Sequence, residues 1–416
     1  MSEQTRPFAS RYALAFIFMT QLIDTIGLGI IIPVTPKIIG ELTGEGLSAA
    51  AWWGSWLMGI FALMQFLCAP AMGNLSDRFG RRPVLIISLI ALAIDYAITG
   101  AAPTIAWLFI GRFLSGMAGA TYPTVNAYIA DVSPPEKRAA NFGLTGAAFG
   151  LGFILGPGIG GFVGDHWGAR APFFVAAGFA LANALFGLVV LKESLPAAQR
   201  RPFEWWRANP VGTLAALRRY PMIFGLIGVT ILMRLAHDSL PTTWTYYTML
   251  KFGWTPGDVA LSLMAVGALT ALSFGFLPRL VVPLIGEINA VYIGFLAAGV
   301  GYLGYAYATQ PWMIYAWMVF WSFGGLSNPA LNAIMSRGVP ANEQGELQGA
   351  LASIGSITSI AAPLIMSNLF WYFTSGRAPI HFAGASFLLA GLCELAALGF
   401  FARLQRRVAA TAQPAE

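Results

Sequence analysis

The chain has 416 residues, of which 57% are hydrophobic and only 10% are charged, and its net charge is +6. Soluble domains carry about 25% charged residues, so a soluble fold could not hide this much apolar surface, and we expect a membrane protein. The basic residues lie in short segments between apolar runs, which excludes a nucleic-acid partner. The two cysteines fall inside apolar runs, so neither a disulfide framework nor a metal site is expected.

Twelve apolar stretches of about 20 residues predict twelve transmembrane helices. They lie near residues 13–38, 51–72, 84–101, 104–126, 140–163, 171–191, 222–250, 257–280, 287–308, 312–335, 346–371 and 379–404. The longest polar connection, a basic linker at 192–220, separates an N-terminal bundle at 1–191 from a C-terminal bundle at 221–416. The predicted fold is an all-α membrane protein with two pseudo-symmetric six-helix bundles.

The distribution of lysine and arginine predicts the orientation of these helices. Eighteen of the 24 basic residues fall on the side that holds both termini, four fall on the opposite side, and Arg112 and Arg234 lie inside spans. Because positive charge accumulates in cytoplasmic loops, both termini and the linker are expected in the cytoplasm.

The first predicted helix carries an acid, Asp24, about eleven residues into the span. A charged group at this depth costs at least about 2.5–3.5 kcal/mol, so it needs a partner or a function. Gly27 and Gly29 flank it and are expected to leave room for a ligand or water. We interpret Asp24 as a proton-binding or substrate-binding carboxylate; a structural hydrogen bond to a neighbouring helix is the alternative.

A charged loop follows the second predicted helix, and its glycines, Gly73 and Gly80, favour a tight turn. Asp77 is placed to pair with Arg81, and Asp131, at the end of the fourth helix, is placed to reach the same arginine. We expect a gating cluster that latches the bundles when the cytoplasmic side is closed. The alternative is a topology anchor with solvated charges, since surface ion pairs contribute little.

Two further ionisable residues, Asp95 in the third helix and Arg112 in the fourth, are expected near each other. A structural salt bridge and a role in proton or substrate binding are equally open for this pair. In the fifth helix, Gly152, Gly156 and Gly160 recur every four residues beside Pro157 and Gly161, a spacing that favours close helix packing and a bend.

The seventh predicted helix holds Arg234, His237 and Asp238, followed by Pro241. Arg234, Asp238 and Pro241 are spaced for one face of a helix that the proline should kink. We interpret the three ionisable residues as part of the proton or substrate site; a self-neutralising pair between Arg234 and Asp238 is the alternative.

An internal repeat relates the two halves at an offset of 206 residues. The matching residues are Gly119, Pro123, Asn126, Ala127, Pro134 and Gly143 in the first half and Gly325, Pro329, Asn332, Ala333, Pro340 and Gly349 in the second. Parallel repeats of six helices are typical of transporters that rock two halves about a central site.

These motifs resemble a known family. The stretch 73–83 resembles the signature loop of the major facilitator superfamily, and the stretches 24–33, 111–116, 127–131, 152–161 and 345–349 resemble its tetracycline-resistance branch of drug:proton antiporters. The resemblance implies gating roles for Gly73, Asp77, Arg81 and Asp131, and export for the motif in the fifth helix. It also implies a monomer in the bacterial inner membrane, with the proton as coupling ion, no other cofactor and a small-molecule substrate.

The chain departs from that branch at two positions. The branch has a histidine in helix 8 and an acid in helix 9, where this sequence has Thr270 and Ala298. Tetracycline itself is therefore in doubt as a substrate. We predict a proton-coupled exporter of small amphipathic molecules and no enzyme; a symporter or facilitator that imports a metabolite, and a non-transporting receptor, are the alternatives.

Overall fold

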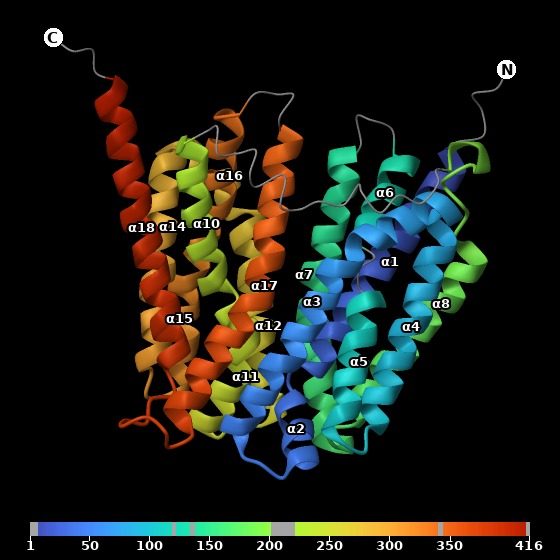
Figure 1. Cartoon of the computed structure of the whole chain (residues 1–416), viewed down its shortest axis with the longest axis horizontal. Helices are drawn as coiled ribbons and strands as arrows, with labels where there is room; N and C mark the ends of the chain where they lie inside the picture. Colours follow the sequence, from blue (N-terminus) through green and yellow to red (C-terminus); the bar gives the residue numbers. More distant parts are fainter. Residues whose placement is uncertain (1–6, 119–121, 134–137, 201–220, 340–343, 413–416) are drawn as a thin grey trace. The chain divides into compact units, whose positions relative to one another are not determined.

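The computed structural model describes residues 7–118, 122–133, 138–200, 221–339 and 344–412, and these residues form helices and their connections without any strand. The chain divides into two compact units (Figure 1). Unit 1 comprises Met1–Ala208 and Trp254–Gly267, and unit 2 comprises Asn209–Gly253 and Ala268–Glu416. From position 201 onward the predicted linker lies outside the described residues, and the division into bundles at 1–191 and 221–416 stays a prediction.

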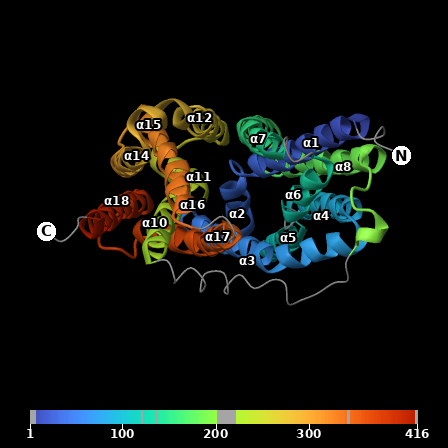
Figure 2. The same ribbon diagram turned by 90° about the horizontal axis from the view of Figure 1, so that it is seen from above.

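Unit 1 contains eight α-helices and the first part of a ninth among its described residues. They are α1 (Pro7–Ile31), α2 (Thr35–Thr43), α3 (Leu47–Phe79), α4 (Arg81–Ala101), α5 (Ile105–Ala118), α6 (Tyr122–Val132), α7 (Arg138–Trp167), α8 (Ala171–Val190) and the start of α12 (Pro256–Gly275), with the 3-10 turn η2 (Ala197–Gln199). Within this unit α1 packs on α7 and α8, α4 packs on α8, and α3 packs on α5 (Figure 2).

Unit 2 is built around α14. Its helices are α10 (Pro221–His237), α11 (Ser239–Phe252), the end of α12, α13 (Leu277–Ile285), α14 (Glu287–Tyr307), α15 (Pro311–Ser322), η5 (Phe323–Leu326), α16 (Ser327–Arg337), α17 (Gln344–Thr374) and α18 (Ala385–Ala412). The central helix α14 contacts α15, α16 and α18, while α10 contacts α17 and α18. Buried apolar side chains from these helices, including Phe295 and Phe401, form one continuous core.

Large apolar side chains also cover the outside of both units. Ile87 is 64% exposed, Val189 86% and Leu284 84%. Water does not solvate such faces favourably, whereas lipid chains do. The surface is therefore that of a membrane protein, as the composition predicts.

Nine described helices are long and apolar enough to cross a membrane, and the pair Ala15–Ile31 and Thr35–Thr43, bent by 48°, makes up to ten. These cover ten of the twelve predicted spans. The other two predicted spans, 104–126 and 312–335, are not single continuous helices among the described residues. Residues 119–121 lie outside the described residues, and Phe323–Leu326 is a 3-10 turn that interrupts the second stretch.

The structure extends the internal repeat beyond the matched residues. α4 and α14 each contain 21 residues and begin at positions 81 and 287, which differ by the same offset as the sequence motifs. Each follows a glycine with positive φ, Gly80 at +104° and Gly286 at +79°. α1 and α10 also end at equivalent positions, Ile31 and His237, and in each case a further helix, α2 or α11, follows after a short turn. Of the matched residues, Gly119, Pro134 and Pro340 lie outside the described part of the chain.

Candidate functional site

The turn between α3 and α4 consists of a single residue, Gly80, and the charged residues expected in a loop lie on the two helix ends instead. Arg81 joins them: its Nη1 lies 2.5 Å from Asp77 Oδ1, and its Nε lies 3.4 Å from Asp131 Oδ2. The same Nη1 donates a hydrogen bond to Ser76 Oγ at 2.6 Å. The predicted pairing of Arg81 with both acids is confirmed, and the gating role of this cluster stays a prediction.

Gly73 does not contribute to that turn. It lies inside α3, where its carbonyl oxygen accepts a hydrogen bond from Ser76 Oγ at 2.7 Å. The expectation of a special backbone conformation at Gly73 is wrong, because α3 continues six residues further, to Phe79, before the chain turns. Gly80 alone has the positive φ that favours glycine here.

Sequence reasoning missed one carboxylate of the cluster, Glu193. Its oxygens accept hydrogen bonds from the backbone N–H groups of Arg81 at 2.8 Å and Arg82 at 3.2 Å. A carboxylate at this place satisfies two free N–H groups and faces the positive end of the α4 dipole. Beside it, Ser194 Oγ donates to Asp131 Oδ2 at 2.9 Å. No local signal identifies Glu193, because it is more than 100 residues away in sequence.

The connection after α8 is tied to α6 by Tyr128. The Tyr128 hydroxyl donates to the carbonyl oxygen of Lys192 at 2.9 Å. Burial, reinforced by Glu193 and Asp131, raises the pKa of Tyr128 to about 12, so the hydroxyl stays protonated and keeps donating at physiological pH. Together with Glu193, this bond holds the segment after α8 against the charged cluster.

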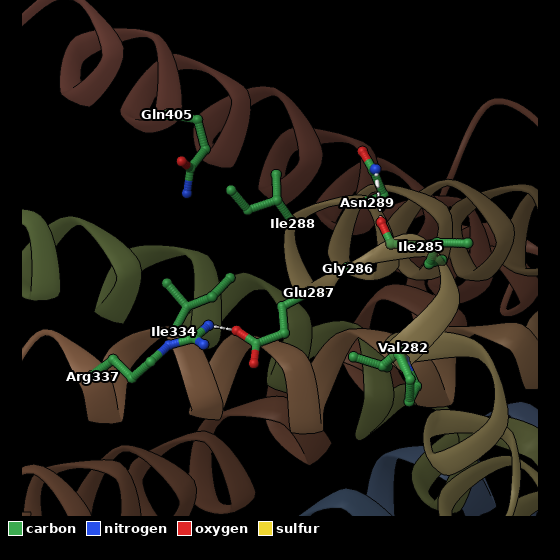
Figure 3. Close-up of a pocket in the computed structure, with 10 residues that line it drawn as sticks. Val282, Ile285, Gly286, Glu287, Ile288, Asn289, Ile334, Arg337 and Gln405 are labelled. Atoms are coloured by element: carbon green, nitrogen blue, oxygen red, sulfur yellow. Dashed lines mark hydrogen bonds and ion pairs between the residues drawn. The ribbon is translucent and has the colours of Figure 1, made fainter. Parts of the chain in front are cut away.

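Unit 2 contains the same arrangement with the signs exchanged. At the offset of 206, Arg81 corresponds to Glu287 and Asp131 corresponds to Arg337, and Arg337 Nη2 forms an ion pair with Glu287 (Figure 3). The pair lines a cavity of about 790 Å³ at one end of α14, together with Ile334 and Gln405 (Figure 3). The two halves therefore share one design, in which the start of one predicted span is joined to the end of the next.

Asp95 and Arg112 form the buried ion pair of unit 1, as predicted. Arg112 Nη2 lies 3.3 Å from Asp95 Oδ2, and the Asp95 side chain is fully buried. Thr99 Oγ1 donates to the other carboxylate oxygen at 3.4 Å. Gly111 makes room for this carboxylate, since a Cβ there would lie 2.5 Å from Asp95 Oδ1. Whether the pair is structural or takes part in binding stays open, since both roles need this contact.

Asp24 differs from Asp95 in having no partner for one oxygen. Its side chain is half-buried in α1, and its Oδ1 atom is buried without a hydrogen bond. Tyr96 of α4, which sequence reasoning missed, is coupled electrostatically to Asp24 and approaches α1 at Gly27. No described contact holds the Asp24 carboxyl permanently in its charged form. Reversible protonation requires that the charge is not fixed in this way.

The expected space beside Asp24 is not found at its two glycines. A Cβ on Gly27 would lie 3.0 Å from the Tyr96 hydroxyl, and one on Gly29 would lie 2.7 Å from Pro157 Cδ. These glycines admit neighbouring helices and not a ligand. The interpretation of Gly27 and Gly29 as ligand space is therefore wrong, because helix packing fills it.

The glycines of α7 form the close helix contact that their spacing predicts. A Cβ on Gly152 would lie 2.7 Å from Thr25 Cβ, one on Gly156 would lie 2.7 Å from the carbonyl oxygen of Ile26, and one on Gly160 would overlap the carbonyl oxygen of Ile30. Gly161 faces the other way, toward Ala260 in the α12 segment of the same unit. α7 therefore packs closely on two sides, and its export role stays a prediction.

The ion pair between Arg234 and Asp238, the alternative to a role in proton or substrate binding, is not formed among the described residues, and the binding role stays a prediction. α10 ends at His237, Asp238 is the turn residue, and α11 begins at Ser239. Pro241 explains the break, because its ring would clash with the carbonyl oxygen four residues earlier in a continuous helix. Among the described residues no ion pair involves Arg234, and its guanidinium instead lies beside Gly355 of α17. His237 is exposed, and its ring stacks on Trp321 with centroids 6.4 Å apart.

The two positions at which the sequence departs from the tetracycline branch both lie in unit 2. Ala298 is buried, and a Cβ on Gly324 of η5 would lie 2.9 Å from it, so the position is packed against a turn. Thr270 lies half-buried in the second part of α12. Neither residue can carry a proton.

The comparisons with known proteins agree with this architecture. Residues 17–363 match the family described as Major Facilitator Superfamily. The chain belongs to this superfamily. It is 38% identical over 361 residues to the tetracycline resistance protein, class C, of Escherichia coli, covering 87% of this chain and 90% of that protein. It is also 30% identical over 364 residues to multidrug resistance protein 1 of Bacillus subtilis (strain 168), covering 85% and 89%.

Solved structures show the same fold. A bacterial homolog of the human lysosomal transporter Spinster, in an inward-facing and occupied conformation, superimposes with a TM-score of 0.76 at 18% identity, covering 98% of both chains. The human organic anion transporter MFSD10 superimposes with a TM-score of 0.68 at 24% identity, covering 94% of this chain and 99% of that one. The protein is thus a multi-pass membrane transporter of the major facilitator superfamily for a small-molecule substrate, and not an enzyme.

Proposed function

We propose that this transporter is a proton-coupled antiporter that exports small amphipathic molecules by alternating access. It works as a monomer in the bacterial inner membrane, with both termini in the cytoplasm. The observation that carries the proposal is the unpaired carboxyl of Asp24, half-buried in a span of a chain related to tetracycline and multidrug resistance proteins. Such an acid can take up a proton from one side of the membrane and release it on the other.

The coupling follows from competition at this carboxyl. When Asp24 is charged, it attracts the polar or cationic part of a substrate, and when it is protonated that attraction is lost. Proton uptake from the outside then displaces the substrate outward, and proton release to the cytoplasm readies the site again. The contact between Asp95 and Arg112 joins α4 to α5 within the same unit.

The charged clusters supply the gating in this proposal. Arg81 with its two acids in unit 1, and Glu287 with Arg337 in unit 2, join helix ends at the side assigned to the cytoplasm. Asp77, Asp131 and Arg337 are the more exposed partners, with 37%, 25% and 69% of their side chains exposed, so water can reach each contact when it opens during a transport cycle. The relatives' names make antibiotics the first substrates to test; Thr270 and Ala298 make a different amphipathic molecule equally worth testing.

Flux into liposomes with an imposed pH gradient tests the proposal. Radiolabelled tetracycline and ethidium serve as probes, and an antiporter accumulates its substrate when the lumen is acidic. Accumulation with an alkaline lumen would instead show a symporter, and no accumulation of any probe or metabolite in either case would support a receptor. Asp24→Asn should abolish gradient-driven uptake without changing folding, whereas Asp165→Asn, an exposed acid on α7, should transport normally. Wild-type flux in Asp24→Asn would refute the proposal.

A further inference from the structure

A second acid inside the membrane, Glu394 of α18, has no role in the mechanism above. It is the tenth residue of the span Ala385–Arg407, which puts it close to the middle of the membrane. Only 4% of the residue is exposed, and its Oε2 atom is buried without a hydrogen-bond partner. No ion pair among the described residues involves it.

The surroundings of Glu394 are provided chiefly by α14, which lies beside α18 (Figure 2). The two helices approach closely at Gly299, where a Cβ would lie 3.5 Å from Glu394 Cβ. One turn further along α14, Tyr302 is coupled electrostatically to Glu394. The Tyr305 hydroxyl and the Glu394 Oε2 atom are buried without a hydrogen-bond partner, and the buried Tyr302 hydroxyl lies near the side chains of Trp321 and Ser239. Three buried polar groups therefore lie in one region.

Within the described part of the chain, no ion pair with a neighbouring cation neutralises this acid. The titratable and charged groups on the central parts of the helices packed on α18 are Tyr302 and Tyr305 of α14, Arg234 and His237 of α10, and Tyr246 and Tyr247 of α11. Asp238 lies at the α10–α11 turn, Cys393 is adjacent on α18, and α17 has no such group from 347 to 371. The Arg234 guanidinium lies beside Gly355 of α17, and His237 stacks on Trp321.

A carboxylate cannot stay charged in this setting. An unpaired charge in an apolar interior is expensive enough that the group binds a proton instead. A buried polar group without a partner also costs stability, which a purely structural acid would avoid by forming a hydrogen bond. In this packing the Glu394 carboxyl is held in its neutral form. The two tyrosine hydroxyls in the same region are available as hydrogen-bond partners once the packing changes.

We propose that Glu394 is a second proton-binding site, located in unit 2 and assisted by Tyr302 and Tyr305. In the packed arrangement the carboxyl holds one proton. When α14 and α18 separate and water enters, the O–H bond breaks, the proton passes to water, and the tyrosine hydroxyls donate hydrogen bonds to the carboxylate that remains. This proposal rests on the antiport proposed above, to which it adds a second proton per cycle besides the one at Asp24.

Infrared spectroscopy of the purified protein tests the protonation directly, because the C=O stretch of a carboxylic acid is separate from the bands of a carboxylate. At neutral pH the wild-type spectrum should contain this band, and Glu394→Gln should lack the component that belongs to Glu394. Glu394→Asp should retain a shifted component, and Asp24→Asn should leave the Glu394 component unchanged. Tyr302→Phe should shift it, which gives a second reading should Glu394→Gln fail to fold. An undiminished band in Glu394→Gln, or an unmoved one in Tyr302→Phe, overturns the proposal.

Transport measurements test whether the proton is used. With ethidium or tetracycline in liposomes, the ratio of protons to substrate, measured from the reversal potential, should fall by one proton in Glu394→Gln. An unchanged ratio would overturn the second site while leaving antiport intact. Absence of proton-driven flux in the wild type would instead refute the proposed antiport, and the infrared result would still decide the protonation of Glu394. The two failures are therefore distinguishable.

Discussion

Removing Arg112 should expose how much of unit 1 depends on one buried ion pair. Asp95 is fully buried and the Arg112 side chain is 15% exposed, so Arg112→Gln leaves a carboxylate in the interior without its cation. Losing one partner of a buried pair costs about 3–5 kcal/mol. The contact here is single and 3.3 Å long, and Thr99 still donates to the other oxygen, so we expect the lower end of that range, about 3 kcal/mol.

A double-mutant cycle isolates this interaction. Arg112→Gln, Asp95→Asn and the double variant are unfolded with sodium dodecyl sulfate in mixed micelles, and unfolding is followed by tryptophan fluorescence. At about 1.36 kcal/mol per tenfold change, 3 kcal/mol lowers the folding equilibrium constant by roughly 160-fold. The double variant should recover most of that loss, because both charges are then absent and no buried charge is left unpaired.

The loss of stability measured in this cycle should depend on pH in a direction that the structure predicts. In Arg112→Gln the unpaired carboxyl of Asp95 can relieve its burial by taking up a proton, so the loss of stability should be smaller at low pH and grow as pH rises. The double variant has no acid there and should show no such trend. A loss below about 0.5 kcal/mol in Arg112→Gln, or strictly additive effects in the double variant, would refute the reasoning.

Three other predictions concern packing and gating. Gly160→Ala should destabilise the protein by about 1–3 kcal/mol, because the new methyl group overlaps the α1 backbone; Gly150→Ala on the same helix meets nothing within 4 Å and should be neutral in a thermal melt. Exchanging the charges of the unit 2 pair (Glu287→Arg with Arg337→Glu) should restore the transport per folded molecule that either single change impairs, and a folded double variant no better than the folded singles would contradict the ion pair's role. Glu193→Gln should weaken the α4 start by about 0.5–2 kcal/mol, the effect typical of a lost helix cap, measured by denaturant titration.

The sequence predicted those parts of the site that are set by local geometry. Asp77 and Arg81 lie four residues apart, so a helical backbone alone brings them together. The spacing of the α7 glycines likewise predicted a close helix contact before its partner was known. The predicted topology added Asp131, because the end of the fourth helix lies on the same side of the membrane as the start of the third, although 50 residues separate Asp131 from Arg81.

Other contacts depend on how distant helices meet, and the sequence carried no sign of them. Glu193 reaches the start of α4 from a segment after α8, and Tyr96 reaches α1 from α4. The alternative of an ion pair between Arg234 and Asp238 assumed a continuous helix. Pro241 was recognised as a kink, and its effect on the carbonyl four residues earlier ends α10 just before Asp238.

The opposite polarity of the ion pairs in the two repeats has a consequence for how a duplicated chain folds. Two copies with identical pairs could exchange partners during synthesis, so that a helix start from one copy docks on the helix end of the other. Here such a mistake would bring Arg81 against Arg337, or Glu287 against Asp131, and each combination is repulsive. The charges at the helix start and the helix end therefore direct each repeat to its own helices. A variant carrying Glu287→Arg with Arg337→Asp has the same charges in both repeats and should misassemble more often during refolding.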